Sequence, residues 1–225
     1  MHEPFAFPEP EPRDEHGLVA FNVPLTVANL HAAYRRGIFP WPHGQGEPIP
    51  WLSPDPRAIL EFDHLRVPSS LAQARRNCGW NFTIDRDFPA VIAACASVPR
   101  PDQPGTWILP AMRKAYTALH ATGLAHSVEV WEGDDLIGGL YGVDPGGVFV
   151  GESMFRLRPN ASKLALLHLV DHLASRGSRW IDIQQLTPHM EALGAHEIPR
   201  ADYIRRLAEA LDAGVSLFPG FSGST

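Results

Sequence analysis

Two polar side chains stand two residues apart in a segment that otherwise has the pattern of a buried β-strand. In WIDIQ, Asp182 and Gln184 alternate with Trp180, Ile181 and Ile183. Because side chains at i and i+2 of a strand point to the same face, we expect the carboxylate and the amide to lie side by side. At the carboxyl end of a strand, Asp182 could accept a proton from an attacking amine while Gln184 aligns the reactants. The alternative is structural, with Asp182 in a cap or a salt bridge and Gln184 ending the strand in solvent.

A second acid, Glu152, interrupts an apolar strand pattern in FVGESMF. A carboxylate buried among apolar side chains needs a partner, because an isolated buried charge is costly. The partner is either an arginine close in sequence, such as Arg156 or Arg158, or the ammonium group of a substrate. The second possibility makes Glu152 a candidate binding residue.

Three tryptophans, Trp41, Trp51 and Trp107, lie in segments rich in proline and glycine, which we expect to be loops. Each can pack over the core, or it can stack on a nucleic-acid base, a contact worth roughly 1–3 kcal/mol per base. Stacking requires no positive charge, which matters because the formal net charge is −6. That charge argues against a broad phosphate-binding surface but not against a local basic patch.

The histidines and cysteines do not form a metal-binding motif. His168 and His172 are spaced i, i+4 in HLVDH, but Leu169 stands where a zinc-protease helix has glutamate. Cys78 and Cys95 are far apart and form no CxxC pair. We therefore expect no metal centre, and we expect free, buried thiols typical of a reducing compartment.

Length and composition are those of a globular protein, with 225 residues of which 44% are hydrophobic and 20% charged. No apolar run is long enough to cross a bilayer. The acidic, proline-rich N-terminus lacks the basic and apolar regions of a secretory signal. We expect a cytoplasmic protein without membrane segments.

The chain divides into a small, proline- and aromatic-rich N-terminal domain, residues 1–60, and an α/β domain, residues 61–225. In the first domain we expect one helix over 25–36, with Thr26 as N-cap, followed by an irregular loop over 37–57. In the second, apolar periodicity and turn residues predict strands at 80–85, 126–132, 135–143, 146–155, 180–184 and 215–218, and helices at 88–96, 110–122, 161–175 and 200–213. We expect the last residues, FPGFSGST, to be disordered.

The order β-α-α-β-β-β-α-β-α-β suggests an α/β fold with a mixed sheet and helices on both faces. It resembles the acyl-CoA N-acyltransferase (GNAT) layout, in which the fourth and fifth strands splay apart and open a cleft. GNAT enzymes hold the coenzyme pyrophosphate with a glycine-containing loop that enters a helix. In the corresponding stretch, residues 158–163, Ala161 and Lys163 fill the two glycine positions. We therefore expect an acyl donor other than acyl-CoA.

Nine segments match one family in order and spacing: AYRRGIFPW, WLSPDPRAIL, GTWI, AHSVEVW, LIGGLYGV, FVGESMF, NASKLALL, IDIQ and LGAHEIPRADY. From Tyr34 to about Leu207, the sequence resembles the leucyl/phenylalanyl-tRNA–protein transferase family. It departs from the family pattern at residues 21–25, FNVPL, where a GGDL-like segment is usual. The resemblance implies a small N-terminal domain followed by a GNAT-like catalytic domain.

The resemblance also implies an activity and a set of site residues. The enzyme would move leucine, phenylalanine or methionine from aminoacyl-tRNA to the α-amine of proteins that begin with arginine or lysine, marking them for N-end-rule degradation. It implies no cofactor, and we expect a monomer. By position, Asp182 and Gln184 would be the catalytic pair, with Glu152 at the same site. The remaining assignments are Trp41 and Trp107 for the terminal adenosine of tRNA, Leu140, Phe149, Leu169 and Leu173 for the aminoacyl pocket, and Arg75 and Arg76 for tRNA phosphates.

Our mechanistic hypothesis is that Gln184 positions the reacting groups while Asp182 helps to draw a proton from the incoming amine. Two alternatives remain open. One is an N-acetyltransferase with a degenerate coenzyme A loop. The other is a non-catalytic module that holds an RNA 3′ end or an N-terminal peptide.

Overall fold

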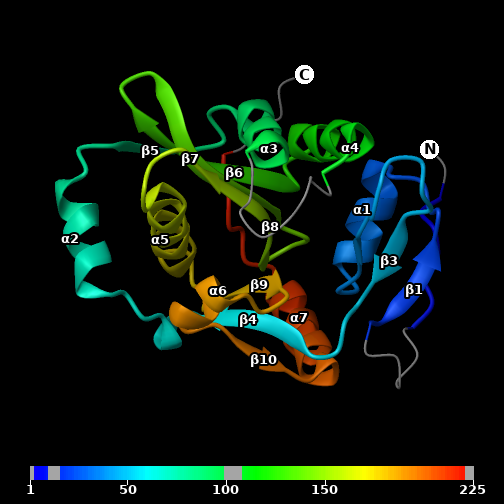
Figure 1. Ribbon diagram of the computed structural model, residues 1–225. Coiled ribbons are helices and arrows are strands. Elements are labelled where there is room, and N and C mark those ends of the chain that lie inside the picture. The colour runs from blue at the N-terminus through cyan, green and yellow to red at the C-terminus, as the bar shows by residue number, and fades with distance from the viewer. Residues whose placement is uncertain (1–2, 10–15, 99–107, 221–225) are drawn as a thin grey trace.

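The computed structural model describes residues 3–9, 16–98 and 108–220 (Figure 1). Within these residues the strands form a three-stranded sheet, of order β1-β3-β2, and a seven-stranded sheet, of order β10-β4-β9-β8-β7-β6-β5. The small sheet and helix α1 lie to one side of the large sheet (Figure 1). Every strand pair is antiparallel except β8 with β9, which is parallel.

The N-terminal segment forms β1 (Leu18–Phe21), α1 (Val27–Tyr34), β2 (Phe39–Pro40) and β3 (Pro50–Leu52). Thr26 caps α1 as expected, because its side chain accepts a hydrogen bond of 3.2 Å from the N–H of Asn29. The prediction of an irregular loop over 37–57 is wrong, since β2 and β3 lie in it. Pro40 stands in an edge strand and Pro50 begins the central one, positions at which a missing N–H is tolerated.

The large sheet contains β4 (Arg57–Glu61), β5 (Asn81–Ile84), β6 (Ala125–Glu132), β7 (Asp135–Val143), β8 (Phe149–Arg156), β9 (Trp180–Gln184) and β10 (His196–Ile198). The predicted hairpin is confirmed, since β6 and β7 pair around the Gly133-Asp134 turn. The five strands predicted between residues 80 and 184 are also confirmed. No sequence pattern predicted β1, β4 or β10.

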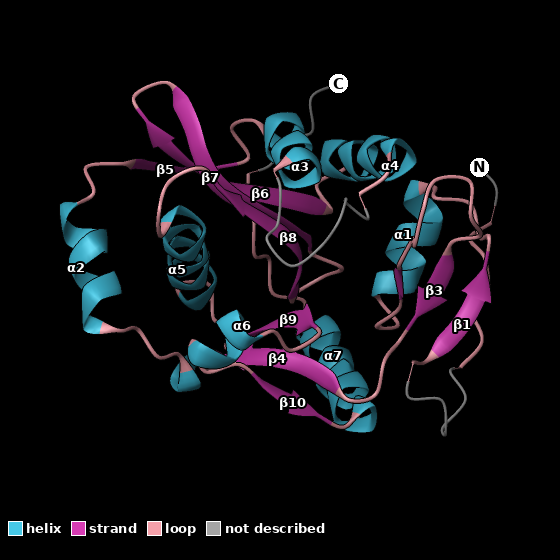
Figure 2. Cartoon of the chain, viewed as in Figure 1, coloured by secondary structure: helices cyan, strands magenta, loops and turns pink. Residues whose placement is uncertain are grey.

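Helices cover both faces of the large sheet, as expected (Figure 2). Helices α3 (Phe88–Ser97) and α4 (Pro110–Ala121) pack on one face and α5 (Ala161–Ala174) on the other. Two glycines of β7 show the close contacts on each side: a Cβ on Gly138 would lie 2.5 Å from the Cβ of Ala161, and one on Gly139 would lie 3.6 Å from Val91. The remaining helices are η1 (Phe62–His64), α2 (Ser69–Asn77), α6 (Pro188–Ala192) and α7 (Arg200–Ala213).

The C-terminal segment differs from the prediction. Residues 215–218 form no strand; Leu217 is buried, and its carbonyl oxygen lies 2.9 Å from Nε2 of His172. Phe218 stacks on His126 with ring centroids 3.7 Å apart, so the expected disorder is wrong for this residue. These apolar side chains reach the core without joining a sheet edge. Residues 221–225 lie outside the described part of the chain.

The mixed α/β fold is confirmed, while the likeness to GNAT enzymes and the domain boundary at residues 60/61 stay predictions. In the described residues, no helix is both long and apolar enough to cross a membrane. No disulfide joins the two cysteines. Cys95 is buried as expected, and Cys78 is only half-buried.

Candidate active site

The parallel strands β8 and β9 separate after two paired positions. Phe149 pairs with Ile181 and Val150 with Asp182, and no further β8–β9 pair occurs in the described residues. A cavity of about 560 Å³ lies where the strands diverge. Its wall is mainly apolar and includes Leu140, Tyr141, Phe149, Met154, Phe155, Leu166, Leu169, Ile181, Ile183 and Met190. A splayed strand pair therefore supplies a pocket that is large enough for an apolar side chain.

Glu152 is the acid in this wall. Its Oε1 accepts hydrogen bonds from the hydroxyl of Tyr34 at 2.7 Å and from Nε2 of Gln184 at 2.7 Å. Its Oε2 accepts one from the hydroxyl of Tyr116 at 3.2 Å, and the two tyrosine hydroxyls also contact each other. Arg158 pairs with Glu132 instead, so the structural alternative of a Glu152–Arg158 ion pair is wrong. Glu152 is held by neutral donors.

This environment changes the acidity of Glu152. Burial raises the pKa of its carboxyl to about 7, while the three hydrogen bonds oppose the rise and the nearby Asp182 carboxylate adds to it. Burial also raises the pKa of Tyr34 and of Tyr116 well above their usual value, so both hydroxyls stay protonated and can donate. Glu152 therefore exchanges a proton close to neutral pH, as a general acid or base requires.

Asp182 is bound quite differently, in an ion pair with Arg57. Nε of Arg57 donates to Oδ1 at 2.9 Å and an amino group of Arg57 donates to Oδ2 at 2.7 Å. The hydroxyl of Tyr203 adds a bond of 2.8 Å to Oδ2. Arg57 is 1% and Asp182 0% exposed, so this bidentate pair is fully buried. The salt bridge foreseen as the alternative role of Asp182 is present.

Arg57 was missed by the sequence analysis. It begins β4, 125 positions before Asp182. The segment PRAIL carries only one hint, a charged residue ahead of an apolar run. Its guanidinium lies 4.8 Å from the ring centre of Phe39 and 4.5 Å from that of Tyr203. Burial lowers the pKa of Arg57, but Asp182, Tyr203 and Tyr34 together outweigh burial and raise that pKa, so Arg57 stays protonated.

Gln184 joins the two acids. Its backbone N–H donates to Oδ1 of Asp182 at 2.8 Å while its side chain reaches Glu152. This is possible because its backbone leaves the strand geometry, with a φ of 65°. Asp182 contacts the backbone of Gln184 and not its side chain, so the expected placement of both side chains on one strand face stays a prediction; neither residue faces solvent. The connection runs from Arg57 through Asp182 and Gln184 to Glu152.

The four residues assigned to the aminoacyl pocket separate into two groups. Leu140, Phe149 and Leu169 line the cavity. Leu173 is fully buried in the core but is not part of the lining. It follows Leu169 by one helical turn, which carries it about 6 Å farther along α5.

Two basic side chains that the sequence analysis missed as functional residues lie at the edge of the cavity. Arg156 and His189 both contribute to its lining. Nε2 of His189 is buried and has no hydrogen-bond partner among the described residues. Burial, then Lys163 and Arg156, lowers the pKa of His189, which places these three side chains near one another.

Known proteins with similar sequences decide the family. Residues 59–208 match the family model of leucyl/phenylalanyl-tRNA protein transferase, and residues 24–55 match that of its N-terminal domain. A leucyl/phenylalanyl-tRNA–protein transferase of Anaeromyxobacter sp. is 49% identical over 207 residues, 92% of this chain and 88% of that protein. Another, of Chromohalobacter salexigens, is 52% identical over 213 residues, 94% and 82% of the two chains. This chain belongs to the leucyl/phenylalanyl-tRNA protein transferase family. The resemblance inferred from the sequence is confirmed.

The tryptophans assigned to adenosine binding in this family member are only partly described. Trp41 is partly buried, packs on the core beside α1 and meets Phe39 edge-on at 5.8 Å. Trp107 lies outside the described residues. Trp51 is completely buried in β3, so for this residue the core-packing alternative is correct and the predicted loop is wrong.

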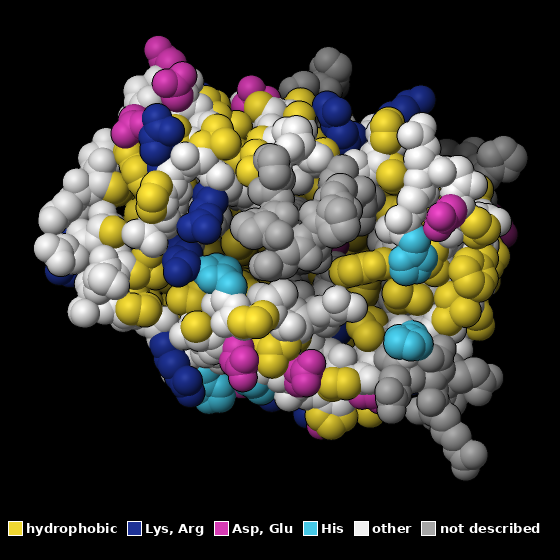
Figure 3. Space-filling view, viewed as in Figure 1, with side chains coloured by type: hydrophobic (Ala, Val, Ile, Leu, Met, Phe, Trp, Pro, Cys, Tyr) yellow, Lys and Arg dark blue, Asp and Glu magenta, His cyan; other side chains and the backbone are white. Residues whose placement is uncertain are grey.

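Arg75 and Arg76, assigned to tRNA phosphates, end helix α2, which stands beside α5 away from the sheet (Figure 1). Arg76 is exposed, and Arg75 forms an exposed ion pair with Asp171 of α5. On the face seen in Figure 3, Lys and Arg side chains form separate groups with apolar and neutral surface between them. The contact of Arg75 and Arg76 with tRNA phosphates stays a prediction.

Proposed function

We propose that this chain transfers leucine, phenylalanine or methionine from aminoacyl-tRNA to the α-amine of proteins that begin with arginine or lysine. The observation that supports it is the cavity between β8 and β9, whose wall is mainly apolar and whose acid, Glu152, is held by a hydrogen bond from Gln184. The apolar wall can bind a side chain that is not branched at Cβ, as in leucine, phenylalanine and methionine. The Glu152 carboxyl can bind the incoming amine. Discrimination among the three aminoacyl groups is worth about 1–3 kcal/mol per methylene.

The reaction needs alignment and proton transfer, because the aminoacyl ester is already activated. The amine nitrogen bonds to the carbonyl carbon, the bond from that carbon to the ribose oxygen breaks, and the amine proton finally reaches the ribose oxygen. We assign the intermediate proton acceptor to Glu152, whose pKa of about 7 is suited to it. This departs from our hypothesis that Asp182 draws the proton.

Asp182 is better suited to positioning. Four donors already occupy its two oxygens: two from Arg57, one from Tyr203 and the N–H of Gln184. Through that N–H it fixes the turn of Gln184, and the amide of Gln184 in turn orients Glu152. Asp182 therefore acts through Gln184 rather than on the substrate.

For tRNA, we propose that Trp41 and Trp107 stack on the terminal adenosine and that Arg75 and Arg76 contact phosphates. Arg156, Lys163 and His189 add positive or hydrogen-bonding groups at the edge of the cavity, where the end of the tRNA backbone enters. We further propose a GNAT-like catalytic domain over 61–225 behind an N-terminal domain over 1–60. The protein would be a cytoplasmic monomer that needs no cofactor, and its products would enter N-end-rule degradation.

The test is transfer of radiolabelled leucine from leucyl-tRNA to a peptide that begins with arginine. We expect label in the peptide, and none in a matched peptide that begins with alanine. Binding of the charged tRNA without transfer would support the non-catalytic module instead. Saturable binding of acetyl-CoA in a calorimeter would support the N-acetyltransferase.

A further inference from the structure

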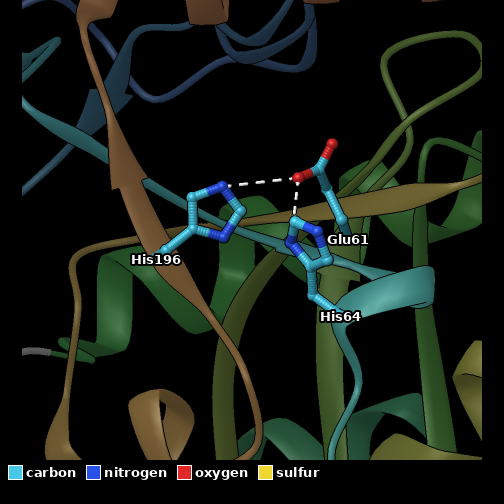
Figure 4. Close-up of side chains that lie close together, drawn as sticks. All are labelled: Glu61, His64 and His196. Carbon is cyan, nitrogen blue, oxygen red and sulfur yellow. Dashed lines mark ion pairs between the residues drawn. The ribbon is translucent and has the colours of Figure 1, made fainter.

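Three side chains that do not line the cavity lie close together at the outer edge of the large sheet (Figure 4). Glu61 ends β4, His64 ends η1 and His196 begins β10. Nδ1 of His64 lies 3.3 Å and Nε2 of His196 lies 3.4 Å from the same oxygen, Oε2 of Glu61. All three candidate ligand atoms lie within 4.8 Å of one another. We propose that Glu61, His64 and His196 bind a divalent transition-metal ion, with Zn²⁺ as the preferred probe.

The spacing favours a shared ion over direct hydrogen bonds. Charge-assisted N–H to carboxylate bonds are usually about 2.7–2.9 Å long, shorter than both distances here. Ligands about 2.0–2.1 Å from a tetrahedral Zn²⁺ are separated from each other by about 3.3–3.4 Å. The two distances from Oε2 of Glu61 to the histidine nitrogens match this spacing, and the two nitrogens lie within 4.8 Å of each other. Two imidazoles and one carboxylate also form a ligand set that Zn²⁺ commonly takes.

The surroundings leave room for a fourth ligand. The side chains of His64 and His196 are 59% and 36% exposed, so a water molecule can complete the coordination. Arg206 of α7 donates to Oε1 of Glu61 at 2.7 Å and leaves Oε2 for the metal. Because Arg206 is a cation, it lowers the affinity of the site without occupying a ligand position.

The site has a structural consequence that is independent of the proposed transferase activity. His196 pairs with Ile59, so β10 is attached to the sheet only along β4 in the described residues. An ion shared by His196, Glu61 and His64 ties this edge strand to β4 and to η1. Metal bound to the folded state alone would raise the thermal stability of the protein.

The experiment uses the untagged full-length chain, freed of metal with a chelator and then titrated with Zn²⁺ in a calorimeter. We expect one Zn²⁺ per chain and a rise in Tm on binding. His64→Ala, His196→Ala and Glu61→Gln should each weaken binding at least tenfold, and Arg206→Gln should strengthen it severalfold. Co²⁺ should give the intense visible absorption of a tetrahedral complex in the wild type.

The controls are His43→Ala, an exposed histidine elsewhere, and a double alanine variant of His168 and His172. Neither should change the dissociation constant. Far-UV circular dichroism establishes that each variant is folded, and His64→Gln offers a milder change if alanine disturbs η1. The proposal is overturned if the wild type takes up no Zn²⁺, or if the affinity is the same after both His64 and His196 are replaced.

Discussion

Two acids lie within neighbouring strands, yet they have opposite environments. Asp182 of β9 faces a buried guanidinium and is paired with it at two points. Glu152 of β8 has three neutral donors, from Tyr34, Tyr116 and Gln184. Asp182 lies outside the lining of the cavity, whereas Glu152 is part of it.

On the basis of this difference we propose a positioning role for Asp182 and proton transfer for Glu152. A carboxylate whose oxygens accept four hydrogen bonds, two of them from a guanidinium, is held in one orientation, which suits it to orienting neighbouring groups. A carboxyl without a cation, in a partly apolar wall, exchanges its proton near neutral pH. Gln184 bonds to both acids, so the geometry set at Asp182 is passed on to Glu152.

The strongest test of this contrast removes Arg57. In Arg57→Met, Asp182 would remain buried without its cation, which should lower the free energy of unfolding by about 3–5 kcal/mol. Urea denaturation at neutral pH measures the loss. The matched control, Arg75→Met, breaks the exposed pair with Asp171 and should cost less than about 1 kcal/mol. Equal small losses in both variants would contradict the role given to the buried pair.

The second test is the pH dependence that belongs to Glu152. Its pKa rises from 4.5 to about 7 on folding, so the folded protein binds a proton more tightly than the unfolded chain. The resulting stabilisation is fully present below pH 4.5 and is lost as the pH rises through 7, up to about 3 kcal/mol in total. Glu152→Gln should remove this dependence. Urea unfolding of both proteins between pH 4.5 and 8 measures it, and a constant difference between them across that range would refute the assignment.

The third test concerns the cavity beside Glu152 and compares Leu169→Val with Leu173→Val. Both changes remove one buried methylene. Each should lower the free energy of unfolding by about 0.5–1.5 kcal/mol, the loss that is typical of Ile→Val in a protein core. Only Leu169 lines the cavity, so only its variant should change the ratio of kcat/KM for phenylalanyl- and leucyl-tRNA, by about 1 kcal/mol or severalfold. An equal change in that ratio for Leu173→Val would show that the pocket extends farther along α5.

We expect the smallest effects from removing the tyrosine hydroxyls that donate hydrogen bonds to Glu152 and Asp182. Tyr34→Phe removes a donor that lowers the pKa of Glu152, so the midpoint of the pH–activity curve should move upward, by less than about one pH unit. Tyr203→Phe removes a donor to Asp182 and should lower the free energy of unfolding by about 0.5–1.5 kcal/mol. It should leave the midpoint of the pH–activity curve unchanged. The pH dependence of kcat/KM, measured for both variants, tests this difference; an equal shift of the midpoint in both would contradict it.

Local patterns predicted the elements of this fold well where short-range physics governs them. Thr26 caps α1, Gly133 and Asp134 turn the hairpin, and helix and strand periodicities hold from residue 80 to 184. The failures lie where distant contacts decide. Pro50 begins a strand because β1 and β2 flank it, and Phe218 is ordered because the His126 ring receives it.

The site follows the same division. The sequence alone determined the family, the neighbouring positions of Asp182 and Gln184 and the apolar character around Glu152, because residue type and strand periodicity are local properties. Only the tertiary structure brought Arg57 to Asp182 and two tyrosines to Glu152, across separations of 36 to 125 residues. Which acid is paired with a cation and which exchanges a proton near neutral pH depends on those long-range neighbours, because burial and hydrogen-bond donors set the energy of the charged form.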